Sequence, residues 1–123
     1  MMQKDLKELL LAFNEQGVEY LVVGGYAVGV HSEPRATKDL HIFIRADVRI
    51  GIPPLRIDIL QSIDGVAFDD AWNDRIEGLV DGEITAHIIS KEHLIQNKLA
   101  LGRTRDLPDV EAIRDANPEA DAE

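Results

Sequence analysis

The segment Tyr20-Leu21-Val22-Val23-Gly24-Gly25 decides the fold of this chain. The run Tyr20–Val23 predicts a short buried strand, because aromatic and β-branched side chains suit a covered, pleated surface. Gly24 and Gly25 end that strand, and they let the backbone approach an anion because glycine has no Cβ. A helix that begins there would direct unpaired N–H groups at a phosphate. We therefore expect a strand and a helix joined at an anion site.

The segments around this unit predict an α/β chain with a mixed sheet flanked by helices. Apolar residues at helical spacing make Lys4–Gln16 an amphipathic helix that Gly17 stops. Asp81-Gly82 is a strong hairpin signal between two apolar runs. The other expected strands are Asp39–Arg45, Leu55–Leu60, Ile76–Val80 and Ile84–Ile89. Two further helices are expected at Tyr26–His31 and Phe68–Arg75. Ser90 caps a helix that runs to about Leu101, and a last helix has Pro108 in its first turn and is stopped by Pro118.

Acidic side chains lie within two of these strands. On a strand, residues i and i+2 project to the same face, so Asp39 and His41 share one face. Asp58, on the next strand, can add a third ligand to an oxygen cage of the kind that Mg²⁺ prefers. His41 stands where this chemistry would want Asp or Glu, and imidazole suits other divalent ions better than Mg²⁺. The candidate metal ligands are therefore Asp39, His41 and Asp58.

Length and composition limit the possible functions. The 123 residues suffice for one modest domain, expected over residues 1–118, with an acidic flexible tail at 119–123. The chain has no cysteine, which excludes disulfides and thiolate metal sites. Its polar N-terminus and the lack of a long apolar run predict a cytoplasmic protein without a membrane span. A net charge of −10 disfavours a broad duplex-binding surface but leaves small charged substrates possible.

Several motifs, taken in order, resemble those of the nucleotidyltransferases of the DNA polymerase β superfamily. That family's pattern is a hydrophobic strand with a Gly-Gly or Gly-Ser turn, a strand with two spaced carboxylates, and a third carboxylate strand. A C-terminal element also resembles the branch that includes abortive-infection toxin-type nucleotidyltransferases. The matching segments are Val22–Val28 with His31, Arg35–Leu40, Arg56–Leu60 and Lys98–Asp109.

The resemblance implies roles for particular residues. Gly24 and Gly25 would hold a nucleoside triphosphate such as ATP, and Lys98 would approach the nucleotide. Asp39 and Asp58 would be catalytic and bind Mg²⁺, or Mn²⁺ or another divalent ion given His41. Asp58 would also be the candidate base for the attacking hydroxyl. Three polar residues before the acidic strand, Arg35, Thr37 and Lys38, would contact phosphate.

The chain departs from the family in two places. His41 occupies the position of the second carboxylate, which costs the site one negative charge. Members of the family carry a larger segment between the acidic strands, whereas Ala46–Ile52 makes this connection directly. The pocket is then either open or closed by another subunit. Ile50, Ile52 and Leu55 lack an obvious covering helix, so we expect a homodimer with an interface that includes Val48–Leu55.

Simpler interpretations remain for each feature. The glycine pair can be a plain turn, and Asp39 and Asp58 can be solvated charges at strand ends. His41, like the other histidines, can be a hydrogen-bonded structural residue. Lys98, Arg103 and Arg105 can form a solvated face paired with acidic residues such as Asp106. A Walker site is rejected, because no Gly-Lys-Ser/Thr follows the glycines.

Three functions compete on this sequence. The favoured one is metal-assisted transfer of a nucleoside monophosphate from a triphosphate to a hydroxyl on an unknown protein, RNA or small-molecule acceptor, weakened by His41. The second is a catalytically degenerate module that binds a nucleotide or a partner, such as a component of a toxin–antitoxin pair. The third is a structural oligomer subunit.

Overall fold

The computed structural model describes residues 4–32, 40–45, 57–60, 62–80 and 82–116. Its helices are α1 (Lys4–Gln16), α2 (Gly24–His31), α3 (Phe68–Asn73), α4 (Lys91–Leu101) and α5 (Leu107–Ala116), with a short 3₁₀ turn, η1 (Thr104–Asp106), before α5. Its strands are β1 (Tyr20–Val23), β2 (Leu40–Ile44), β3 (Ile57–Leu60), β4 (Ile76–Val80) and β5 (Ile84–Ile88).

The strands form one five-stranded mixed sheet in the order β3-β2-β1-β5-β4. The central strand β1 runs antiparallel to β2 and parallel to β5. At the two sides, β3 runs parallel to β2 and β4 pairs antiparallel with β5. The predicted fold class, a mixed sheet flanked by helices, is confirmed.

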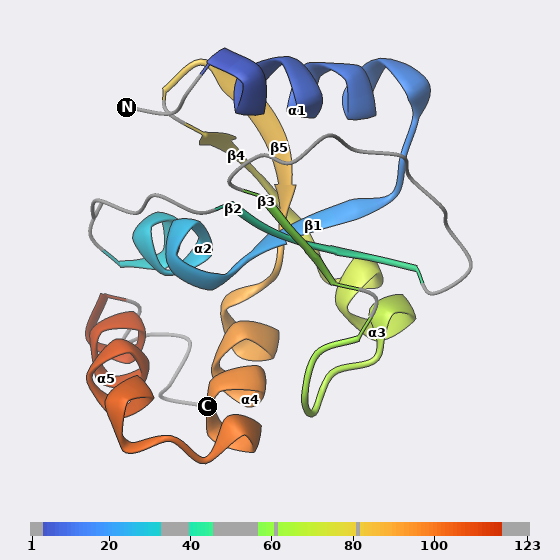
Figure 1. The fold of residues 1–123 in the computed structure, drawn as a ribbon. Coiled ribbons are helices and arrows are strands. Elements are labelled where there is room, and N and C mark those ends of the chain that lie inside the picture. Colours follow the sequence, from blue (N-terminus) through green and yellow to red (C-terminus); the bar gives the residue numbers. More distant parts are fainter. Residues whose placement is uncertain (1–3, 33–39, 46–56, 61, 81, 117–123) are drawn as a thin grey trace.

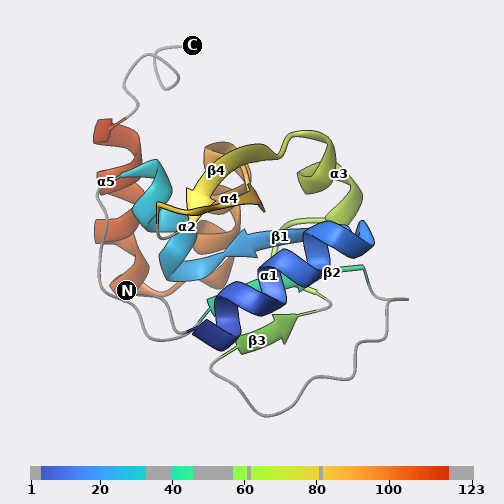
Figure 2. The ribbon, with the colours of Figure 1, turned by 90° about the horizontal axis from the view of Figure 1, so that it is seen from above.

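Helices cover both faces of this sheet. Figure 1 shows α1 above the strands and α2, α4 and α5 below them, and Figure 2 shows α1 lying across the sheet from above. Because of these two layers, β1 is buried along its whole length. Strand β2 is also covered on both sides, since Ile42 and Phe43, which point to opposite faces, are both buried. Phe43 packs edge-on against Phe68 of α3, with ring centroids 5.1 Å apart.

Most described boundaries agree with the predicted ones to within one residue: β2 ends at Ile44 rather than Arg45, and β5 ends at Ile88 rather than Ile89. Two helix boundaries differ by two residues. Helix α2 begins at Gly24 rather than Tyr26, because Gly24, at φ +67°, turns the chain directly from strand into helix. Helix α3 ends at Asn73 rather than Arg75, and its Ala71 is buried whereas Phe68 and Trp72 are only partly buried. The expected caps of α4 are present: Ser90 Oγ accepts the N–H of His93 at 3.2 Å, and Gly102 adopts φ +66° after the last turn.

Several predictions fall outside the described residues. These are the conformation of Ala46–Ile52, the interface expected at Val48–Leu55, and the acidic tail. Among the described helices, none is long and apolar enough to span a membrane. The cytoplasmic location itself stays a prediction.

Candidate functional site

The N-terminus of α2 opens directly from the end of β1. Val23 is the N-cap residue, and it makes no side-chain hydrogen bond to the first turn. The first turn of α2 also contains no acidic residue. Backbone N–H groups at such an end need a partner from elsewhere, and an anion is the natural one. The structure thus keeps the expected strand–helix unit at Gly24 and Gly25.

Strand pairing brings the acidic strands to this helix end. Val23 pairs with His41 on β2, and His41 pairs in turn with Asp58 on β3. These three positions therefore form one row across neighbouring strands, next to Gly24. The strand register thus places the backbones of residues 41 and 58 side by side, and a shared metal site there stays a prediction.

His41 packs directly against the glycine turn. A Cβ added to Gly24 would lie 3.1 Å from His41 Cγ and 3.2 Å from His41 Cβ. Such a contact is tighter than most real Cβ contacts, so His41 would have to shift slightly, and φ at Gly24 is in the left-handed region as well. Glycine at position 24 is therefore favoured both by the turn and by the imidazole beside it.

A cavity of about 540 Å³ lies at this end of the sheet, between the glycine turn and α4. His41 lines it, so its side chain is on the cavity side of the sheet. The lining mixes apolar residues with both charge signs, which suits a ligand with an apolar base and charged groups. The lining residues are Val23, Gly24, Gly25, His41, Leu60, Ser62, Ile63, Asp64, Leu94, Asn97, Lys98, Leu101, Arg103, Arg105, Asp106 and Asp109.

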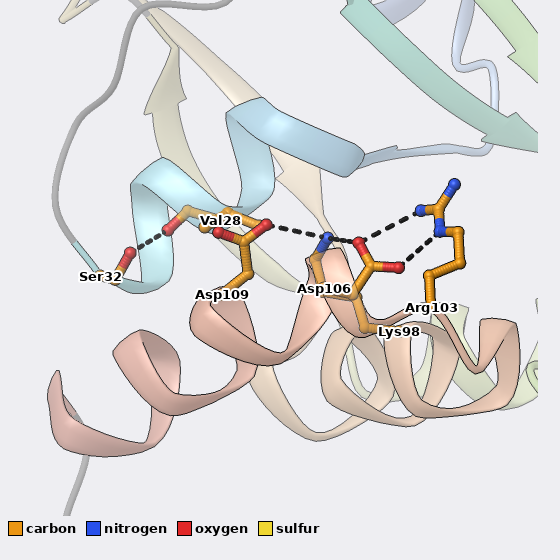
Figure 3. Close-up of polar contacts among 6 residues, drawn as sticks. All are labelled: Val28, Ser32, Lys98, Arg103, Asp106 and Asp109. Atoms are coloured by element: carbon orange, nitrogen blue, oxygen red, sulfur yellow. Dashed lines mark hydrogen bonds and ion pairs between the residues drawn. The ribbon is translucent and has the colours of Figure 1, made fainter.

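Lys98 lines this cavity and is part of an ion-pair network (Figure 3). Its Nζ is 3.3 Å from Asp106 Oδ1 and 3.2 Å from Asp109 Oδ2. Arg103 adds two hydrogen bonds to Asp106, through Nε at 2.6 Å and Nη2 at 3.2 Å. Lys98 is only 9% exposed and Asp106 5%. Lys98 is thus a buried cation: the alternative interpretation was right that it pairs with acidic residues and wrong that it is solvated. Its contact with a nucleotide stays a prediction.

The charges of this network reinforce one another. Hydrogen bonds from Arg103 first, and from Lys98 second, lower the pKa of the Asp106 carboxyl despite its burial. The hydrogen bond to Asp106 likewise raises the pKa of Arg103. The carboxylate of Asp106 therefore stays ionised and fixes both cations at the cavity wall.

Several predicted site residues lie outside the part of the chain that the structure describes. Arg35, Thr37, Lys38 and Asp39 lie outside the described residues, and for Asp58 only the backbone is described. Within the described part of the chain, no group of three or more histidine or acidic side chains could hold a metal ion. Of the proposed ligands, the structure places only the side chain of His41 in the cavity, and a complete metal site would need Asp39 and Asp58.

Sequence reasoning missed one wall of the cavity. Ser62, Asp64 and Asn97 line it, and none of them was predicted as a site residue. The dipeptide Asp64-Gly65 is a turn signal that could have indicated a loop after β3. Its position beside α4 depends on a contact between segments distant in sequence, which no local pattern carries.

The other histidines have structural roles. His31 Nε2 lies 2.7 Å from the carbonyl oxygen of Ile89, and His93 Nδ1 lies 3.0 Å from Ser90 Oγ. His87 packs between the rings of Tyr20 and Trp72, at 5.4 and 5.0 Å, and its buried Nδ1 has no hydrogen-bond partner in the described structure. Burial lowers the pKa of His87, so it is held neutral within this aromatic cluster.

Comparison with protein families supplies the identification. The model of a family described as "Nucleotidyltransferase of unknown function (DUF6036)" matches residues 1–115. The chain belongs to this nucleotidyltransferase family. A search of curated proteins finds no match.

Membership of the nucleotidyltransferase family agrees with the geometry around Gly24. The match spans every described helix and strand up to the last turn of α5, and so includes the segments that line the cavity. The resemblance expected from the glycine turn, the acidic strands and the C-terminal element is confirmed. The family description names neither a substrate nor a metal ion.

Proposed function

We propose that the protein transfers a nucleoside monophosphate from a nucleoside triphosphate to a hydroxyl acceptor, in a metal-dependent reaction that releases pyrophosphate. The observation that carries this proposal is the meeting of three features in one cavity. The N-terminus of α2, without a side-chain cap, opens beside a row of positions 41 and 58, and the cations Lys98 and Arg103, paired with Asp106, line the same cavity. A triphosphate needs all three kinds of group.

Each part of the cavity has a task in this proposal. The N–H groups at Gly24 and Gly25 bind phosphate oxygens, and Arg35, Thr37 and Lys38 add contacts from the segment before β2. Lys98 adds a positive charge that Asp106 and Asp109 hold in place. Such a preorganised charge stabilises the transferring phosphoryl group without moving during the reaction.

Asp39, His41 and Asp58 would hold the divalent ion, Mg²⁺ or Mn²⁺. When bound, this ion would offset the negative charge on the attacking and leaving oxygens. Asp58 would accept the proton of the attacking hydroxyl. The imidazole at position 41 provides one less negative charge than a carboxylate, so we expect slow transfer.

Labelled triphosphates test this proposal. Incubation with triphosphates labelled on the α-phosphate, with Mg²⁺ or Mn²⁺ and with protein, RNA and small hydroxyl compounds as acceptors, should give weak labelling. His41→Asp should increase it, because that change restores an oxygen ligand and a charge. Asp39→Asn should abolish it. If His41→Asp changes neither metal affinity nor labelling, His41 takes no part in metal binding.

The position of His41 also favours a second candidate. An imidazole packed against Gly24 occupies the place where a carboxylate would bind metal. The protein would then be a degenerate module that binds a nucleotide or a partner, as in a toxin–antitoxin pair. This candidate predicts nucleotide binding without transfer by either the wild type or the His41→Asp variant.

A further inference from the structure

The chain after β3 forms a turn that is fastened to α4. We call residues 62–66 the 62–66 turn, which Ile63 and Val66 close by a β-bridge. The side chain of Gln96 donates a hydrogen bond to the carbonyl of Gly65, and Asn97 Nδ2 donates one to the carbonyl of Asp64 at 2.9 Å. Two adjacent residues of α4 therefore hold the backbone of this turn.

Close packing adds to these hydrogen bonds. Gly65 has φ +77°, and a Cβ added to it would lie 2.6 Å from the Cβ of Ala100. No other residue type could bring the turn so near to α4. The 62–66 turn is thus a preformed wall, whereas a loop without such contacts would first have to be ordered by a ligand.

The strand register gives the distance of this wall from the phosphate end. Asp58 is level with His41, and Leu60 is level with Phe43, farther along β2. Two residues of strand span roughly 7 Å, and the turn begins beyond Leu60. Gly24 and the 62–66 turn line the same cavity, so a nucleotide with its phosphates at Gly24 would extend its sugar towards the turn.

The charge of Asp64 disfavours phosphate as the ligand of this wall, although Arg103 lines the same cavity. Asp64 and Ser62 are exposed and line the cavity, so the turn offers an anionic carboxylate and a hydroxyl. A carboxylate repels phosphate but accepts two hydrogen bonds from neighbouring hydroxyl groups. Acidic side chains bind the ribose hydroxyls in this way in other nucleotide sites.

We propose that the 62–66 turn recognises the sugar of the nucleotide, with Asp64 accepting hydrogen bonds from the ribose hydroxyl groups. The site then selects ribonucleoside over deoxyribonucleoside triphosphates. This inference rests on the proposed function, because it takes the cavity to be the nucleotide site.

Binding of matched nucleotides tests the role of Asp64. Dissociation constants are measured by calorimetry with Mg²⁺ for the four ribonucleoside triphosphates, their 2′-deoxy and 3′-deoxy forms, and inorganic triphosphate. Loss of a hydrogen bond to a charged group should weaken binding of at least one deoxy form by about ten- to a hundredfold. Asp64→Ala should reduce this preference to less than about threefold, without weakening inorganic triphosphate.

Glu92→Ala is the matched control, because Glu92 is exposed on α4 and does not line the cavity. It should leave the preference unchanged. Asp64 is exposed, and its hydrogen bond with Asn97 uses the backbone carbonyl rather than the side chain. Asp64→Ala should therefore fold, and a thermal melt verifies this.

The outcomes separate the two claims. Equal binding of ribo and deoxy forms by the wild type, or a preference that survives in Asp64→Ala, overturns sugar recognition and leaves the nucleotide site standing. Failure of every triphosphate to bind overturns the proposed function together with this inference.

Discussion

At the scale of single residues, Gly24 carries two constraints that can be separated by experiment. Its φ of +67° disfavours any side chain, and an added Cβ would make a tight contact of 3.1 Å with Cγ of His41. Gly17 has nearly the same φ, +68°, with nothing within 4 Å of an added Cβ. The pair therefore offers a matched comparison.

We predict that Gly24→Ala lowers the free energy of unfolding more than Gly17→Ala does. Placing alanine in the left-handed region costs about 1–2 kcal/mol in both variants. Only Gly24→Ala must also displace His41. Chemical denaturation of the two variants measures the difference. Equal losses would mean that His41 does not pack against Gly24.

Asp106 is the residue on which the Lys98 network depends. We predict that Asp106→Asn lowers the free energy of unfolding at pH 7 by about 3 kcal/mol, because it leaves the buried Lys98 with one carboxylate fewer. Asp115→Asn, on the exposed side of α5, should change it by less than about 0.5 kcal/mol.

The effect of Asp106→Asn on the free energy of unfolding should depend on pH. Since the folded pKa of Asp106 is lowered below its ordinary value of 3.8, its contribution to stability is complete above that value and is lost as the pH falls through the folded pKa. The wild type and Asp106→Asn should therefore converge in stability below about pH 4. Denaturation curves at pH 7, 4 and 3 measure this. A constant difference across them would show that Asp106 is not held ionised by its cations.

At the scale of elements, the contact between the 62–66 turn and α4 can be tested by a double-mutant cycle. We predict that Gly65→Ala destabilises the protein by more than about 2 kcal/mol, because φ strain and a clash with Ala100 add. Ala100→Gly should relieve the clash but not the strain, so the double variant should be more stable than the sum of single effects predicts. Strict additivity in chemical denaturation would contradict the packing of Gly65 on α4.

The sequence predicts elements well where local chemistry defines them. α1 and β1 were predicted at the bounds that the structure has, and Ser90 and Gly102 marked the ends of α4. The glycine turn and the order of the acidic strands also predicted one end of the cavity. Burial of Lys98 and docking of Asp64-Gly65 were not predictable, because both depend on packing between segments distant in sequence.

At the scale of the whole molecule, assembly remains a prediction. We expect a homodimer through Val48–Leu55, and replacing Ile50 and Ile52 together with Lys should give a smaller species in light scattering. A wild-type chain that is monomeric at high micromolar concentration would contradict this expectation.

The central claim is that the cavity beside Gly24 binds a nucleoside triphosphate. Thermal melts with each of the four ribonucleoside triphosphates, with Mg²⁺ or Mn²⁺ at millimolar concentration, test it most directly. At about 100 times its dissociation constant, a bound nucleotide should add roughly 2.7 kcal/mol to the free energy of unfolding and raise the melting temperature. Gly24→Ala should lose most of this shift. No shift with any triphosphate and either metal ion would contradict the claim.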